Sequence, residues 1–169
     1  MQDMFGLLFL VIFSAVSLIA FFLAIRLFFP QRVMQVQRAA EEMHSRAFLL
    51  GVVNTLFMAA IIIGLLALAE NTGSGIISIL AILLMVVFVV VLALGLTAVI
   101  QMAGIRLMPE ANENRRFILG ALVIVLGSLT PFIGWFGFFL YVSFLGVGSV
   151  IVSLFSKAKK NKSEDISAE

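Results

Sequence analysis

The chain has 169 residues, of which 63% are apolar and only 12% are charged. Because soluble domains carry about 25% charged residues, this composition excludes an ordinary soluble domain and indicates a protein that folds in lipid. The absence of cysteine excludes disulfides, cysteine-ligated metals and thiol catalysis, and the eleven basic residues and net charge of +2 are better explained by membrane topology than by nucleic-acid binding.

Uncharged stretches occupy most of the chain, at residues 4–25, 47–69, 71–105 and 117–156. About 20 apolar residues suffice for a helix to cross a bilayer, so each stretch is long enough to do so. We therefore predict an all-α, multi-pass helical bundle formed by a single transmembrane domain over residues 1–156. A flexible, charged cytoplasmic tail is predicted at residues 157–169.

The first predicted span covers residues 4–29. No basic residue precedes it, and its apolar stretch is longer than the core of a secretory signal, so we interpret it as a retained anchor. Arg26 and Pro30 are expected to end the span. An arginine stops transfer through the membrane, and a proline disfavours helix at the residue before it.

An amphipathic cytoplasmic linker helix is predicted next, over residues 30–46. Its apolar side chains recur at alternating intervals of three and four residues, which places them on one face, at Val33, Val36, Ala40, Met43 and Ala47. Charged side chains occupy the other face. Two interpretations of this helix remain open: it lies in the plane of the lipid headgroups, or it extends the second span out of the membrane.

The second and third spans are predicted at residues 47–69 and 76–105. Between them, residues 70–75 are rich in Asn, Gly and Ser and form a tight turn without a basic residue. The third span is longer than a perpendicular crossing requires. Tilting of the helix, or a projection beyond the bilayer near Gln101, accommodates the excess.

The last uncharged stretch is predicted to fold back on itself. As one straight helix, its roughly 40 residues would be about 60 Å long, twice the ~30 Å thickness of the hydrocarbon core. A corner at Thr130, Pro131 and Gly134 suits this reversal, because proline removes an amide donor and glycine permits turn dihedrals. The limbs, residues 117–129 and 132–155, are either two full passes or a re-entrant pair.

The basic residues predict the orientation of the chain. With the N-terminus outside, the C-terminus inside and five membrane helices, all eleven fall on the cytoplasmic side of the inner membrane, as the positive-inside rule expects. Basic side chains at the ends of spans are candidates for contact with lipid headgroups. These candidates are Arg32, Arg38, Arg46, Arg115, Arg116, Lys157, Lys159 and Lys160.

No uncharged stretch contains an Asp, Glu, Lys, Arg or His, so the usual components of a proton relay or an intramembrane metal site are missing. We predict no catalytic, metal-binding or cofactor-binding residue, and we interpret the single histidine, His44, as part of a solvated face. Small residues and amides within the spans are expected to mediate helix packing. The candidates are Asn54, Ala60, Gly64, Gln101, Gly146, Ser149 and Ser153.

From about Pro30 onward, the chain resembles the small transmembrane domain attached to bactofilin-like, polymer-forming cytoskeletal proteins of bacteria. The segments that carry the resemblance are the starts of two spans, the proline corner and a late glycine pair, at residues 46–51, 115–120, 131–135 and 145–148. The chain departs from that pattern because it contains no β-helical polymerising domain. The resemblance implies a membrane-embedded scaffold or anchor, and it carries over no catalytic residue.

Two hypotheses about function follow. The leading hypothesis is a non-enzymatic membrane protein that acts as an anchor, scaffold or small accessory subunit, with membrane lipid and other membrane subunits or a second copy of the chain as partners. The alternative is a carrier or channel for an uncharged or lipid-like solute, with Asn54 or Gln101 and the broken hairpin as its site. Neither hypothesis requires a cofactor or nucleic acid.

Overall fold

The computed structural model describes residues 2–130 and 132–166. Within these residues the chain forms helices and no strand, which confirms the predicted all-α class. The elements in chain order are α1 (Gln2–Phe28), α2 (Pro30–Glu42), α3 (His44–Thr72), α4 (Gly75–Leu107), α5 (Glu113–Leu129), the π-helix η1 (Ile133–Phe138) and α6 (Phe139–Ile166). Residues 157–166, for which the sequence predicts a flexible tail, continue α6 as helix.

Four helical segments within the described residues are long and apolar enough to cross a membrane: Phe9–Phe28, His44–Thr72, Gly75–Leu107 and Phe136–Phe155. They correspond to the three predicted spans and the second limb of the predicted hairpin. The first limb, α5, has 17 residues, fewer than the ~20 that a crossing needs. A fifth crossing by α5 therefore stays a prediction.

The linker forms a separate helix, α2, with a buried apolar face. Pro30 lies at its start, where the missing amide hydrogen costs nothing. Val33 and Val36 pack against Ala98 of α4 and Val150 of α6. The backbone changes direction at Met43, where φ is −127°, so α2 does not run straight into α3. The apolar stripe thus serves packing within the bundle.

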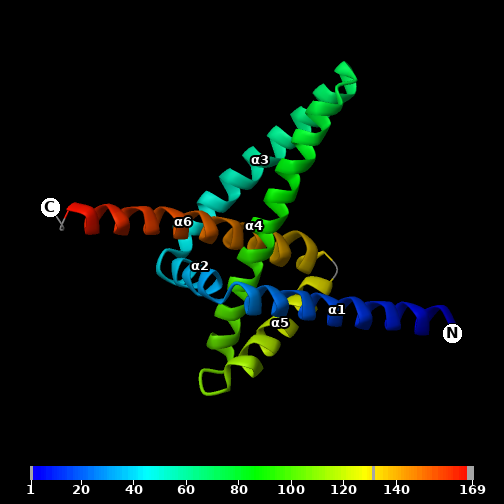
Figure 1. Cartoon of the computed structure of the whole chain (residues 1–169). Helices are drawn as coiled ribbons and strands as arrows, with labels where there is room; N and C mark the ends of the chain where they lie inside the picture. The colour runs from blue at the N-terminus through cyan, green and yellow to red at the C-terminus, as the bar shows by residue number, and fades with distance from the viewer. Residues whose placement is uncertain (1, 131, 167–169) are drawn as a thin grey trace.

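Helices α3 and α4 form a long hairpin that extends away from the other helices (Figure 1). Gly73 ends α3 with a φ of +63°, a left-handed conformation that glycine adopts without steric cost, as expected for the predicted turn. Apolar side chains near this end of the hairpin, such as Ile63 and Ile79, are exposed. Such surfaces suit contact with lipid or with another membrane helix.

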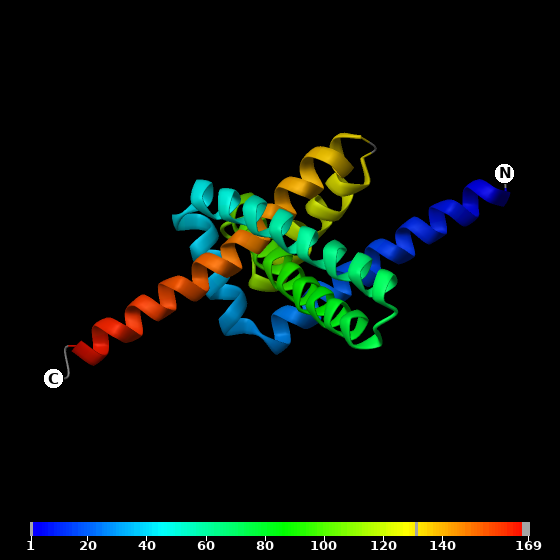
Figure 2. The ribbon, with the colours of Figure 1, turned by 90° about the horizontal axis from the view of Figure 1, so that it is seen from above.

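The core of the bundle surrounds the C-terminal half of α4. This helix contacts α1, α2, α3, α5 and α6, and its residues Ala98 and Ile100 are fully buried. Viewed from above, α1 and α6 run past α4 with their free ends on opposite sides of the molecule (Figure 2). Helix α4 is therefore the element on which the rest of the bundle is assembled.

The chain folds back between α5 and α6, which confirms the predicted reversal. Helix α5 ends at Leu129, Thr130 is extended, and η1 begins at Ile133. Gly134 is buried, and a Cβ on it would overlap the carbonyl oxygen of Gly127, so a side chain does not fit there. Pro131, the centre of the predicted corner, lies outside the described residues.

The two limbs of this reversal pack together at the corner, where η1 contacts α5, and diverge beyond it. Helix α5 packs on α1 and α4, and α6 packs mainly on α3 and also on α4 and α2 (Figure 1). Glycines allow these contacts, because a Cβ on Gly51 of α3 would overlap the backbone of Phe144 in α6. Close backbone approach to α3 and α4 therefore determines the direction of α6.

The predicted orientation leads to a labelling experiment on a chain that naturally lacks cysteine. A cysteine introduced by Lys160→Cys is expected to escape a membrane-impermeant thiol reagent in intact cells and to react after permeabilisation. Asn71→Cys, at the exposed turn between α3 and α4, is expected to react in both cases. Labelling of the Lys160→Cys protein in intact cells would overturn the orientation.

Candidate functional site

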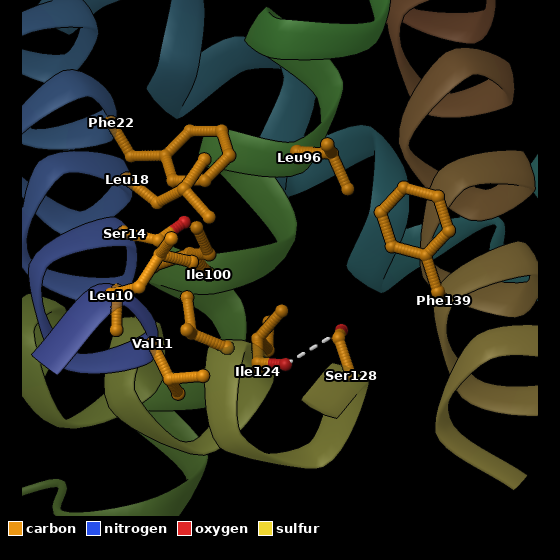
Figure 3. A pocket seen from close by; sticks show the side chains of 12 residues that line it. Leu10, Val11, Ser14, Leu18, Phe22, Leu96, Ile100, Ile124, Ser128 and Phe139 are labelled. Carbon is orange, nitrogen blue, oxygen red and sulfur yellow. Dashed lines mark hydrogen bonds between the residues drawn. The ribbon is translucent and has the colours of Figure 1, made fainter. Parts of the chain in front are cut away.

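An apolar cavity of about 400 Å³ lies between α1, α4, α5 and α6 (Figure 3). The side chains that line it are Leu10, Val11, Ser14, Ala15, Leu18, Phe22, Leu96, Ile100, Ile124, Val125, Ser128 and Phe139. In Figure 3, the α1 side chains form one wall and Phe139 of α6 stands opposite them. This volume falls within the range of about 300–1,000 Å³ that small-molecule sites occupy.

The floor of the cavity is buried and its rim is exposed. Ile100 of α4 is fully buried and Ile124 of α5 is 7% exposed, whereas Leu10 of α1 is 66% exposed. Leu18 and Phe139 on the rim are also exposed. The cavity therefore opens on the surface of the bundle, and a ligand can reach it without unfolding of the helices.

The chemistry of the cavity is almost entirely apolar, and none of the described side chains that line it is charged. The Ser128 hydroxyl donates a 2.7 Å hydrogen bond to the carbonyl oxygen of Ile124. The hydroxyl of Ser14 lies among the apolar side chains (Figure 3). Because lipid tails are as apolar as leucine, a ligand in this cavity is retained by close packing more than by exclusion from water.

A polar cluster lies at one end of the same group of helices, around a small second cavity of about 50 Å³. We name it the Arg26 cluster; its members are Arg26, Gln101, Ile105, Glu113, Arg116 and Phe117. It contains two guanidinium groups and one carboxylate. The charge of the cluster is therefore positive at neutral pH.

Arg26 connects α1 to α5 within this cluster. Its Nη2 lies 3.1 Å from Oε2 of Glu113, and its Nη1 donates a 3.2 Å hydrogen bond to the backbone carbonyl of Glu113. The Arg26 side chain is 12% exposed and the Glu113 side chain is 84% exposed. The guanidinium also lies over the ring of Phe117, 5.1 Å from its centroid. Arg26 is thus a mostly buried cation, whereas its carboxylate partner is exposed.

Gln101 and Arg116 complete the polar side of the cluster. An Arg116 Nη2–H donates to the carbonyl oxygen of Pro109. Within the described residues, the buried Arg116 Nε and the buried Gln101 Oε1 have no hydrogen-bond partner. Since buried polar groups normally find partners, this donor and this acceptor are suited to contact with a polar ligand group.

The cavity and the Arg26 cluster lie next to each other along the same three helices. On α1, Phe22 of the cavity is one helical turn from Arg26 of the cluster, and on α4, Ile100 of the cavity is adjacent to Gln101. On α5 the order is reversed, because Phe117 precedes the cavity residue Ile124. The arrangement is therefore amphiphilic, with an apolar space at one end and charged groups at the other.

The structure places the predicted packing residues in different environments. Gly146 lies against the backbone of Gly95 in α4, and the buried Ser149 hydroxyl donates to the carbonyl oxygen of Leu145. Ser153 is half-buried and donates to the carbonyl oxygen of Val150, while Asn54 is half-buried on α3. Ala60 and Gly64 are exposed on α3, and a Cβ on Gly64 would meet no atom within 4 Å.

Among the predicted headgroup contacts, Arg116 belongs to the Arg26 cluster. The others with described side chains are exposed: Arg32, Arg38, Arg46 and Arg115. The side chains of Lys157, Lys159 and Lys160 lie outside the described residues. Gln101, predicted as a packing residue, also belongs to the cluster, so the structure brings together residues that the sequence assigned to different roles.

His44 has a structural partner. Tyr141 of α6 lies with its hydroxyl 2.5 Å from Nε2 of His44, which connects the start of α3 to α6. Nδ1 of His44 lies 3.3 Å from the carbonyl oxygen of Ala40, so Nδ1 is the donor and Nε2 accepts from the tyrosine. In the part of the chain that the structure describes, no group of three or more His, Asp or Glu side chains could hold a metal ion.

The sequence alone did not predict the pairing of Arg26 with Glu113 or the role of Phe117. Arg26 was interpreted only as the end of a span, and the two partners of the ion pair are 87 positions apart. The spacing of Phe22 and Arg26, four residues apart, places them on one face of a helix, but no sequence pattern indicates which helix lies opposite that face.

Over the described residues, the fold and the site define a class of protein: an all-α bundle with four helices that are long and apolar enough to span a membrane, and with an apolar cavity near a cationic cluster. Comparison of the chain with protein-family models, with curated proteins and with solved structures finds no match.

Proposed function

We propose that this protein binds a lipid-like molecule in the cavity between α1, α4, α5 and α6, as a membrane-embedded carrier or lipid-binding protein. The observation that carries the proposal is the cavity itself, which has an apolar lining, a buried floor and an exposed rim. Its volume of about 400 Å³ suits part of an acyl chain or a ring system better than an ion or a sugar.

Packing supports this ligand class. Helical membrane proteins gain stability from close contact between side chains, and an unfilled space forfeits those contacts. A flexible apolar chain in the cavity conforms to the side chains of α1 and restores the contacts that an empty cavity lacks. The described side chains of the lining include no charged group for a hydrophilic solute, so the proposal does not extend to transport of ions through this cavity.

A cavity-filling substitution tests the proposal. Ser14→Trp places an indole where the Ser14 side chain meets the cavity, and we expect it to reduce the amount of co-purified lipid-like molecule about tenfold or more, as seen by native mass spectrometry. Ser17→Trp is the matched control, because Ser17 is exposed on the same helix and does not line the cavity. Equal ligand occupancy in the two variants would contradict the proposal.

A second candidate function is that of a non-enzymatic anchor, scaffold or small accessory subunit, as the resemblance to the bactofilin-associated domain implies. The exposed apolar length of the α3–α4 hairpin favours it, in particular the open surface around Ala60 and Gly64. Small residues at such a surface let another helix approach closely. The location proposed for this role is the inner membrane, where such an anchor could hold a cytoskeletal polymer on the cytoplasmic side.

One measurement separates the two functions. Native mass spectrometry of the tagged protein, extracted from its own membrane in mild detergent, gives the mass of the complex and of its ligands. A monomer that carries a specific small molecule supports the lipid-binding function. A reproducible larger assembly without such a molecule supports the scaffold and argues against the lipid-binding function.

A further inference from the structure

We infer that the Arg26 cluster is the headgroup site for the ligand of the cavity, and that the group it binds is an anionic phosphate. This inference rests on the proposed function, because it assigns the polar end of the same ligand. Neighbouring segments of α1, α4 and α5 line the small cavity of the cluster and the apolar cavity.

Unused hydrogen-bond donors support a phosphate. Arg26 has five N–H donors, of which the contacts with Glu113 occupy two. Arg116 donates to Pro109 through Nη2, while its buried Nε–H has no partner within the described residues. Two planar guanidinium groups with donors to spare match the geometry of phosphate oxygens, which accept paired hydrogen bonds.

The electrostatics of the cluster also favour an anion. Glu113 opposes binding of an anion, but among the described residues that line the small cavity it is the only carboxylate, against two arginines. It is also 84% exposed, so its charge is screened by solvent, whereas Arg26 is largely removed from solvent. An anion that contacts Arg26 from its buried side therefore meets a strong electrostatic field, and Glu113 can remain on the solvent-exposed side of the guanidinium.

The spacing along α1 sets the distance that one molecule has to reach from one cavity to the other. Phe22 and Arg26 are four residues apart on α1, which corresponds to a rise of roughly 6 Å along the helix. A phospholipid whose phosphate contacts Arg26 and Arg116 has to extend about one helical turn to place its chain in the apolar cavity. Gln101 lies at this boundary, and its buried Oε1 is placed to accept from a hydroxyl of the head.

Lipid titrations of the delipidated full chain test the inference, with native mass spectrometry as the readout. The probes are dioleoylphosphatidylglycerol, dioleoylglycerol, which has the same chains without the phosphate, and sodium phosphate alone. We expect the phospholipid to bind the natural protein about tenfold or more tighter than the diacylglycerol. Arg116→Gln should abolish this preference, whereas Arg116→Lys, which keeps the charge, should retain most of it.

Arg106→Gln is the matched control, because Arg106 is exposed near the same end of α4, carries the same charge and does not line the cluster. We expect it to change the preference by less than about twofold. Gln101→Leu is a second variant that leaves the charges in place, and it should weaken phospholipid binding about threefold or more. The melting temperature of each variant shows whether it is folded.

The outcomes separate the inference from the proposed function. Equal affinity for the two lipids, with both weakened by Ser14→Trp, overturns the headgroup site and leaves the cavity function intact. If neither the phospholipid nor the diacylglycerol binds, both the headgroup site and the cavity function are overturned. Binding of sodium phosphate alone, lost in Arg116→Gln, supports the anion site and assigns it to a soluble phosphate instead of a lipid.

Discussion

Gly51→Val is expected to separate α3 from α6 and to lower the melting temperature of the detergent-solubilised protein by about 6 °C or more. A Cβ on Gly51 would overlap the carbonyl group of Phe144, and a Cβ on Gly148 would overlap that of Ala47, so the two helices touch through their backbones. Neither backbone can yield without moving a helix. Overpacking of this kind costs about 3 kcal/mol of stability. For a chain of this size, each kcal/mol lowers the melting temperature by roughly 2–4 °C.

Gly64→Val is the matched control, because Gly64 belongs to the same helix and a Cβ there meets no atom within 4 Å. We expect its melting temperature to lie within about 2 °C of the natural protein, since valine differs little from glycine in an exposed helix. Gly148→Val tests the same contact from the side of α6 and should resemble Gly51→Val. A Gly51→Val protein as stable as the Gly64→Val protein would refute the backbone contact between α3 and α6.

Phe117→Ala is expected to have the second large effect, a loss of about 3–5 kcal/mol of stability. Phe117 is 1% exposed, belongs to the main core cluster and lies under the guanidinium of Arg26. Truncation to alanine leaves a space between α1 and α5. It also removes the cation–π contact with Arg26, which by itself contributes roughly 0.5–2 kcal/mol to stability. Thermal unfolding followed by circular dichroism measures the loss.

Phe155→Ala provides the comparison for this substitution, because Phe155 is 71% exposed near the far end of the membrane-span segment of α6. We expect a change of less than about 1 kcal/mol there. Phe117→Leu should recover part of the loss, since leucine refills most of the space but offers no ring to Arg26. Similar stabilities for Phe117→Ala and Phe155→Ala would show that the α1–α5 interface does not contribute to the fold.

Local composition was sufficient to predict two of the turns. Gly73 and Ser74 form the turn between α3 and α4, and the chain reverses after Leu129, within the segment that the sequence marks with proline and glycine. These features depend on neighbouring residues, because glycine, serine and proline favour turn dihedrals whatever lies opposite. The break between α2 and α3 at Met43 carries no such residue and was not predicted from the sequence.

The candidate site was only partly visible in the sequence. Gln101 was identified as an unusual amide and Arg116 as a basic residue at the start of a span, and both belong to the Arg26 cluster. Their proximity to Arg26 and Phe117 had no sequence signal, because it results from packing of α1 and α5 on the same part of α4. The apolar cavity could not be predicted from the sequence either, because its lining residues are of the same types as the leucines and isoleucines that face lipid.

The sequence by itself determined that this protein is all-helical, that its uncharged stretches are long enough to span a membrane, and where the chain turns. Those properties depend on the solvation of each segment and on local backbone preferences. Only the tertiary structure decided that α6 packs on α3 instead of beside α5, and that Arg26 pairs with Glu113. The physical reason is that close contact between helices depends on matched surface shapes, such as Gly51 against Phe144, which no single segment contains.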